Sequence, residues 1–218
     1  MLLPASVAAC GAAQTPAGAQ TTVLSLEHLD CAECGTKLAA AVRERPGVFK
    51  ASFDRRRAEL TVVAAPSFEP LGTARAIALA SKEEYAVVPG AGHGAYVAWA
   101  QAPVGADVKT VVEEGRDLRD LGEVVVKSKV TVIDFSAVWC EPCRALDAHM
   151  MEVVRSRADV AYRKLDVGDW DTPLAQRYLK TVKQLPYAIV YDKAGNKVDS
   201  ISGLDLARLD AAIAKGER

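Results

Sequence analysis

The chain has 218 residues, of which 50% are hydrophobic and 25% are charged, and its formal net charge at pH 7 is −1. This composition suffices for a buried core and excludes an intrinsically disordered chain. The small net charge gives no electrostatic basis for binding nucleic acid, and no apolar run approaches the roughly 18 residues of a membrane-spanning helix. The length allows one large domain or two small ones.

Cysteines are the most informative residues of the composition. Cys31 and Cys34 form one Cys-x-x-Cys pair, Cys140 and Cys143 form another, and Cys10 is left over. Two close pairs differ from the dispersed cysteines of a disulfide-stapled secreted domain, so they indicate two separate sites. Neither pair is followed by His, which excludes c-type haem attachment.

Residues 1–20 are predicted to be a signal segment and linker. A short apolar stretch is followed by Val7-Ala8-Ala9-Cys10-Gly11, which resembles a bacterial lipobox. The resemblance implies lipidation at Cys10, and thus a lipid-anchored protein on the periplasmic side of the cell envelope. No Lys or Arg precedes the apolar stretch, so an unstructured leader on a cytoplasmic protein is the alternative.

Residues 21–89 are predicted to form a first, α+β domain. The elements expected from periodicity and turn residues are strands at 21–26, 48–53, 58–64 and 85–88 and helices at 34–45 and 69–81. The order β-α-β-β-α-β is that of the split ferredoxin-like fold. Cys31 and Cys34 then lie where the first strand leads into the first helix.

This segment resembles the heavy-metal-associated domain of copper chaperones, metal-transporting ATPases and periplasmic mercury-binding proteins. Cys31 and Cys34 match the metal-binding pair of that family, Leu29 matches the apolar residue before it, and Pro46-Gly47-Val48 matches the start of its second strand. Glu33 departs from the pattern by placing a carboxylate inside the motif. The resemblance implies metal binding at Cys31 and Cys34.

The chemistry of the first pair also favours a metal ion. Two thiolates three residues apart on a loop can bind a soft ion such as Cu(I), Hg(II) or Zn(II) at low coordination number. Two alternatives remain open, namely a second redox pair and a domain that serves only for docking. The choice of metal is also open.

Residues 90–107 are predicted to link the two domains. Glycines and prolines at both ends of this junction are typical of a linker, but Tyr96 and Trp99 make its middle more apolar than a free linker. We therefore expect the middle either to pack on a domain or to add an edge strand.

Residues 108–218 are predicted to form a second, α/β domain with a central mixed sheet flanked by helices. Strands are expected at 108–112, 130–135, 160–165, 188–191 and 197–202, and helices at 113–121, from 140, at 173–179 and at 205–215. The pair Cys140 and Cys143 lies where a buried strand leads into a helix. The helix dipole favours a thiolate at that position.

The motif Trp139-Cys140-Glu141-Pro142-Cys143 and the order of elements resemble the thioredoxin family, over the full second domain. The resemblance implies that Asp134 is the buried acid beneath the disulfide and that Lys164 pairs with it. It also implies that Pro186 is the cis-proline that faces the sulfurs. Trp139 completes this candidate catalytic set.

The leading hypothesis is a thiol–disulfide oxidoreductase of the cell envelope with its own metal-binding domain. Cys140, expected to be the exposed thiol, would attack a protein disulfide, and Cys143 would resolve the mixed disulfide, while an upstream redox partner restores the pair. No cofactor is needed beyond the redox-active disulfide. The expected partners are protein thiols or disulfides and a metal ion, without nucleic acid, and contact with a membrane only through a lipid anchor. The alternative is a non-enzymatic copper or mercury carrier with an auxiliary thioredoxin domain.

Overall fold

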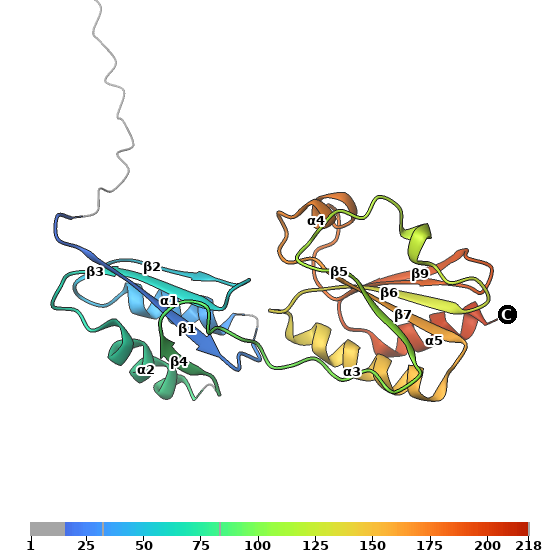
Figure 1. Cartoon of the computed structure of the whole chain (residues 1–218), viewed down its shortest axis with the longest axis horizontal. Helices are drawn as coiled ribbons and strands as arrows, with labels where there is room; N and C mark the ends of the chain where they lie inside the picture. Colours follow the sequence, from blue (N-terminus) through green and yellow to red (C-terminus); the bar gives the residue numbers. More distant parts are fainter. Residues whose placement is uncertain (1–15, 32, 83, 218) are drawn as a thin grey trace, which may run out of the picture.

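The computed structural model describes residues 16–31, 33–82 and 84–217, and it contains two β-sheets with separate hydrophobic cores (Figure 1). The N-terminal unit, residues 20–89, contains β1 (Gln20–Glu27), α1 (Cys34–Arg43), β2 (Val48–Asp54), β3 (Glu59–Ala64), α2 (Pro70–Ser81) and β4 (Ala86–Pro89). Its strands are antiparallel in the order β2-β3-β1-β4. This is the β-α-β-β-α-β order that the sequence predicts.

Alternation of side chains explains why the first sheet has one buried face. Along β3, Leu60, Val62 and Ala64 are buried while their neighbours are partly exposed, as expected of a strand covered on one side. Leu24 and Leu26 of β1 lie in the same core, which also includes residues of α1 and α2. Both helices therefore cover the same face of the sheet.

The C-terminal unit, residues 107–216, has a mixed sheet in the order β5-β7-β6-β8-β9. Its elements are β5 (Asp107–Val112), the 3₁₀ turn η1 (Leu121–Val124), β6 (Val130–Ser136), α3 (Glu141–Ser156), β7 (Val160–Asp166), α4 (Pro173–Tyr178), β8 (Tyr187–Tyr191), β9 (Lys197–Ser202) and α5 (Leu206–Gly216). The strands β5, β7 and β6 run parallel, and β8 and β9 are antiparallel to their neighbours.

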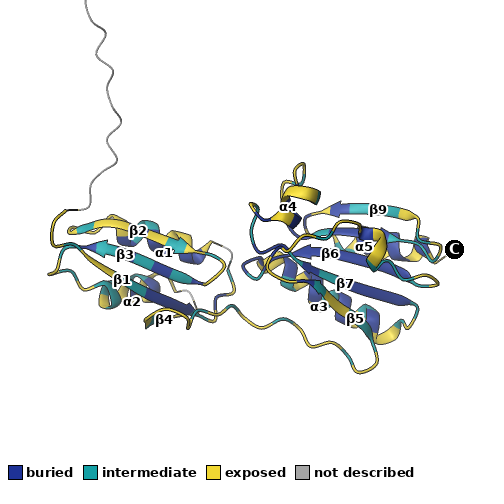
Figure 2. Cartoon of the chain, turned by 45° about the horizontal axis from the view of Figure 1, so that its top comes forward, coloured by how far each residue is buried: buried dark blue, intermediate teal, exposed yellow. Residues whose placement is uncertain are grey.

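The central strand β6 is buried along its entire length (Figure 2). Ile133 and Phe135 belong to the core that contains α4, while Val130 and Val132 belong to the core that contains α3 and α5. A continuous apolar strand is expected where helices cover both faces of a parallel sheet. The end of β6 therefore lies in the interior, four residues before Cys140.

The junction between the units is attached to the N-terminal unit and is not a free tether. Ala95 N–H donates to the carbonyl of Leu26 at 2.9 Å, and Val97 N–H donates to the carbonyl of Leu29 at 2.8 Å. Tyr96 contacts the cores of both units, and Trp99 packs on the C-terminal core. The segment thus packs on the cores, as one of the two alternatives expects, while its pairing with the N-terminal unit is an isolated bridge between Leu29 and Tyr96.

One predicted element of the C-terminal unit is wrong. Residues 113–121, expected to be helical, form turns and irregular chain that lead into η1. The reason is a close approach at Gly115, which has φ of 69° and whose N–H donates to the carbonyl of Asp166. A side chain there would lie 2.4 Å from the carbonyl oxygen of Val167, so the chain turns where a helix would have continued.

Gly94 offers a direct test of the junction. A Cβ at this position would lie 2.2 Å from the carbonyl oxygen of Arg57 and 2.6 Å from that of Ala58. We expect Gly94→Ala to lower the free energy of unfolding by about 1–3 kcal/mol, because backbone atoms must move. The matched control is Gly72→Ala on α2, where nothing lies within 4 Å and a gain of about 0.4–1 kcal/mol is expected. Urea unfolding followed by circular dichroism compares the two, and equal midpoints would contradict the close approach.

Candidate active site

The Cys140–Cys143 disulfide lies at the start of α3. Cys140 is the N-cap residue, and its Sγ accepts a hydrogen bond from the N–H of Cys143 at 3.2 Å. The S–S distance is 2.02 Å, and Pro142 occupies the first turn, where its missing N–H costs no helical hydrogen bond. The N–H of Cys143 at the helix start is thus directed at the sulfur of Cys140, where it and the helix dipole favour a thiolate.

Cys140 is not the exposed thiol that the sequence analysis expects. Its exposed fraction is 2%, against 0% for Cys143, and both belong to the core that Tyr96 and Trp99 of the junction pack against. This core includes contacts from junction residues that lie outside the predicted second domain. Access to the disulfide therefore depends on what lies over this core.

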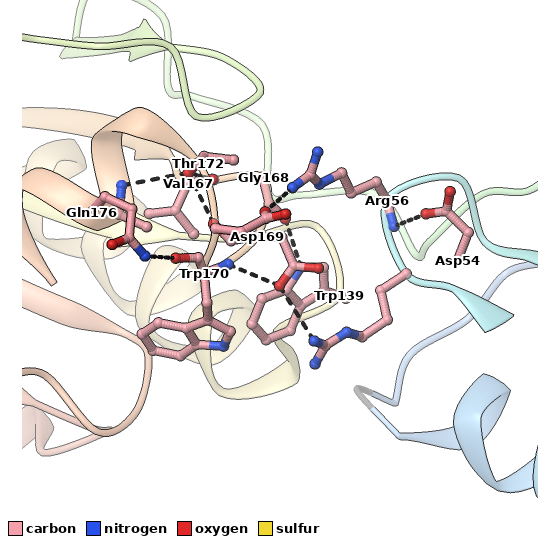
Figure 3. Close-up of polar contacts among 12 residues, drawn as sticks. Asp54, Arg56, Trp139, Val167, Gly168, Asp169, Trp170, Thr172 and Gln176 are labelled. Carbon is pink, nitrogen blue, oxygen red and sulfur yellow. Dashed lines mark hydrogen bonds and ion pairs between the residues drawn. The ribbon is translucent and has the colours of Figure 1, made fainter. Parts of the chain in front are cut away.

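Trp139 is held by contacts from two directions (Figure 3). Its indole N–H donates to the carbonyl of Gly168 at 2.8 Å, and its ring lies 6.3 Å from that of Trp170. The guanidinium of Arg55, from the N-terminal unit, lies 4.8 Å from the centroid of the Trp139 ring. Trp139 is only 6% exposed as a result.

Asp134 lies on β6 as a fully buried carboxylate. Tyr162 of β7 donates its hydroxyl to Oδ2 of Asp134 at 2.8 Å, while Oδ1 has no hydrogen-bond partner among the described residues. Burial raises the pKa of Asp134 to about 7, and the negative charge of Asp147 acts in the same direction. The hydrogen bond from Tyr162 and the charge of Lys164 oppose this rise in the pKa without cancelling it.

Lys164 does not pair with Asp134 as expected. Asp134 and Lys164 are neighbours in the parallel register of β6 and β7, but the ammonium of Lys164 forms an ion pair with Asp147 of α3 at 2.6 Å. The same ammonium lies 4.5 Å from the centroid of the Trp99 ring. The hydroxyl of Tyr162, rather than Lys164, is therefore the direct partner of Asp134.

Asp147 is the site residue that the sequence analysis missed. It is completely buried, one helical turn after Cys143, although every neighbour on that face of α3 is apolar or a cysteine. The sequence does contain a signal for this residue, namely an acidic position on the apolar face of an amphipathic helix. A carboxylate at such a position is buried and needs a charged or hydrogen-bonding partner. Asp147 is thus a second buried acid of this unit, and Lys164 is its partner.

The remaining predicted residue of the candidate catalytic set is Pro186. The Leu185–Pro186 peptide bond is cis, as the sequence predicts, and the carbonyl of Pro186 accepts a hydrogen bond from Gly203 N–H at 2.8 Å. Leu185 belongs to the same core as Cys140 and Cys143. The turn before β8 is thus part of the surroundings of the disulfide.

Cys31 and Cys34 form a second disulfide at the start of α1, with Cα atoms 5.5 Å apart. Cys34 is the first residue of α1 and is buried, whereas Cys31 is half-buried. Among the described residues, no group of three or more His, Cys, Asp or Glu could hold a metal ion. Cys10 lies outside the described residues.

Comparison with known proteins places this site in a family. The family model named Thioredoxin matches residues 118–215. A thioredoxin H-type of Brassica oleracea is 35% identical over 88 residues, covering 40% of this chain and 68% of that protein. Thioredoxin-1 of Schizosaccharomyces pombe is 29% identical over 103 residues, covering 47% of this chain and 96% of that protein.

The chain belongs to the thioredoxin family. A solved thioredoxin structure from Schistosoma mansoni is 25% identical and covers 50% of this chain and 94% of that chain, with a TM-score of 0.38. The protein is a thiol–disulfide oxidoreductase, and thioredoxins need no cofactor for this chemistry. The family match does not include the N-terminal unit.

None of the helices described for this thioredoxin-family chain combines the length and the apolar composition that a membrane span requires.

The titration of Asp134 gives the thioredoxin unit a pH-dependent stability. Its pKa is about 7 in the folded chain, against the ordinary 3.8 of an exposed aspartate. Between these values the folded state keeps a proton that the unfolded state has lost, so stability falls as the pH rises from about 4 to about 7.

We expect Asp134→Asn to remove this fall, which amounts to at most about 1.4 kcal/mol per pH unit. Urea midpoints of both proteins between pH 4 and pH 8 measure the effect. Glu123→Gln, which removes an exposed carboxylate of the same unit, should keep the dependence of the unaltered chain. Parallel curves for the unaltered chain and Asp134→Asn would contradict the raised pKa.

Proposed function

We propose that the protein reduces or exchanges disulfides of other proteins through Cys140 and Cys143. The observation that carries this proposal is the sulfur of Cys140 at the N-cap of α3, with the N–H of Cys143 directed at it. A thiol with an ordinary pKa near 8.5 is about 3% ionised at pH 7, and a helix N-terminus raises that fraction. Cys140 is thus the nucleophile, and Cys143 is the resolving thiol.

The exchange proceeds through a mixed disulfide. The thiolate of Cys140 attacks one sulfur of the substrate disulfide, and the other substrate sulfur leaves as a thiolate. Cys143 then loses its proton and attacks Sγ of Cys140, which reforms the Cys140–Cys143 bond and releases the second substrate thiolate. The substrate gains two electrons, and an upstream dithiol returns them to the pair.

Asp134 is the group suited to receive the proton of Cys143. A carboxylate with a pKa of about 7 changes its protonation state at neutral pH, so it can both take and return a proton. We propose that it acts on Cys143 through water, with Lys164 and Asp147 setting the charge around it. Pro186 and Trp139 frame the disulfide.

We also propose that the N-terminal unit is a ferredoxin-like, heavy-metal-associated domain. The antiparallel order β2-β3-β1-β4 with both helices on one face supports this assignment. Once reduced, Cys31 and Cys34 offer two sulfurs at the start of α1, a donor set suited to a soft ion such as Cu(I). The ion would be cargo, since the redox step does not need it.

The location of the protein is proposed from its sequence. The lipobox-like segment ending at Cys10 supports a lipid anchor on the outer side of a bacterial inner membrane. An oxidising compartment also suits a chain with two disulfides. A cytoplasmic location is the alternative.

A second candidate function is a non-enzymatic carrier of copper or mercury. Two Cys-x-x-Cys pairs, each at a helix start, could both bind a soft ion when reduced. The two candidates differ in whether Cys140 turns over protein disulfides.

Insulin reduction in the presence of dithiothreitol separates these functions. We expect the unaltered chain to accelerate precipitation of the insulin B chain and Cys140→Ala to fall to the dithiothreitol background, because the attacking sulfur is gone. Cys31→Ala is the matched control and should keep its turnover. Equal turnover with and without Cys140 would remove the enzymatic proposal.

Copper stoichiometry tests the N-terminal unit. Each protein is fully reduced and titrated with Cu(I) in competition with bathocuproine disulfonate. The double variant Cys31→Ala, Cys34→Ala should bind one strongly held ion fewer than the unaltered chain, because thiolates are the ligands. The double variant Cys140→Ala, Cys143→Ala should retain that ion. The reverse pattern would place the metal on the thioredoxin pair and favour the carrier function.

A further inference from the structure

An arginine turn of the N-terminal unit contacts the surroundings of the thioredoxin disulfide. The turn, Arg55-Arg56-Arg57, joins β2 to β3, and Figure 3 shows Arg56 directed toward the loop with Asp169 and Trp170. Arg55 lies over the ring of Trp139 and pairs with Asp169 at 3.3 Å, while Arg56 pairs with Asp171. Two of the three arginines thus pair with acidic residues of the loop that follows β7, so the contact is complementary in charge.

A second contact joins the two cysteine loops. Arg144 follows Cys143 on α3 and donates one guanidinium hydrogen bond to the carbonyl of Val138 at 3.0 Å. It donates another to the carbonyl of Asp30, the residue before Cys31. Asp30, in the loop that carries Cys31, therefore lies against the first turn of the active-site helix.

The junction keeps the two units in this arrangement. The hydroxyl of Tyr96 donates to the carbonyl of Arg55 at 2.7 Å, so the junction positions the arginine turn directly. Trp99, three residues later, packs over Lys164 of β7. The contacts between the units thus come from the turn, the cysteine loop and the junction together.

We infer that the Cys31–Cys34 disulfide is a substrate of Cys140 and Cys143 in the same chain, and that the arginine turn docks it there. This inference rests on the proposed function of Cys140 as the attacking thiol. It makes the Cys31–Cys34 disulfide a substrate of the enzyme. It also means that the enzyme keeps Cys31 and Cys34 reduced, the state in which they would bind metal.

The exchange balances without any reagent beyond the dithiol that reduces Cys140 and Cys143. The thiolate of Cys140 attacks Sγ of Cys31, the more exposed sulfur, and the bond between Cys31 and Cys34 breaks. Cys34 leaves as a thiolate at the start of α1, where the helix dipole stabilises it. Cys143 next attacks Cys140, which releases Cys31, so two electrons move from one pair to the other.

The docking contacts are suited to a reversible association. The side chains of the Arg55–Asp169 and Arg56–Asp171 pairs keep part of their surface in solvent, where ion pairs are individually weak. Contacts of this strength raise the local concentration of one cysteine pair near the other but still allow the units to separate. Separation would give the upstream dithiol and other protein substrates access to Cys140.

The test uses the full chain with Cys10, Cys34 and Cys143 replaced by Ser, so that only Cys31 and Cys140 remain. In glutathione redox buffers, we expect a disulfide between these two residues within one chain. Its effective concentration should exceed by about tenfold the millimolar value typical of a short flexible tether. Tryptic peptide mapping identifies the product, because residues 130–144 would be linked to the peptide that ends at Lys37.

Adding Arg55→Ala and Arg56→Ala should lower this effective concentration about tenfold, toward the value for the tether alone. Adding Arg43→Ala and Arg45→Ala is the matched control, because it removes the same charge from exposed positions at the far end of α1 and should change nothing. Only mixed disulfides with glutathione, or links between chains, would overturn the inference. If the Arg55, Arg56 variant and the Arg43, Arg45 variant lowered the effective concentration equally, the docking assigned to the arginine turn would be overturned. Insulin reduction by the unaltered chain, measured in parallel, shows whether the proposed function itself stands.

Discussion

The burial of a carboxylate in the middle of β6 is the constraint on which the C-terminal unit depends. Every residue of this strand is buried, yet Asp134 is placed there with one hydrogen bond, from Tyr162. An ionised carboxylate in such a position is unfavourable, so the protonated form persists up to about pH 7. The strand that stabilises the sheet thereby carries a group that can exchange a proton at neutral pH, directly before the cysteine motif.

The elements of both units could be predicted from sequence because each depends on local rules. Each of these rules involves only a few neighbouring residues. Examples are the alternation along β3, the apolar run of β6 and the proline in the first turn of α3. The helix expected at 113–121 failed because a backbone approach at Gly115 decides it. That approach comes from Val167 and Thr172, some fifty residues later in the chain.

The positions of the site residues that belong to a motif could be predicted from the sequence. The partners of the buried charged side chains could not, because several partners were within reach. Asp134, Cys140 and Cys143 could be placed from the strand and the helix start alone. Lys164 was identified as a site residue, but its predicted partner was Asp134 and its actual partner is Asp147. The sequence does not show that the lysine side chain extends from β7 to the neighbouring helix α3. Asp147 and the cover over Cys140 depend on packing between elements, and the contact of Arg55 with Trp139 depends on packing between units.

In the proposed function, the positions of the two disulfides connect redox state to metal binding. A thiolate is the ligand for a soft ion, and a cysteine in a disulfide offers none, so the same two sulfurs cannot bind metal and remain oxidised. A carrier in an oxidising compartment therefore needs a reductant at its binding loop. The hydrogen bond from Arg144 to Asp30 places that loop beside the first turn of α3, where a dithiol is formed in the reduced enzyme. Since the contacts that hold it there are individually weak, the proposed cycle has the loop accept electrons while docked and bind metal while released.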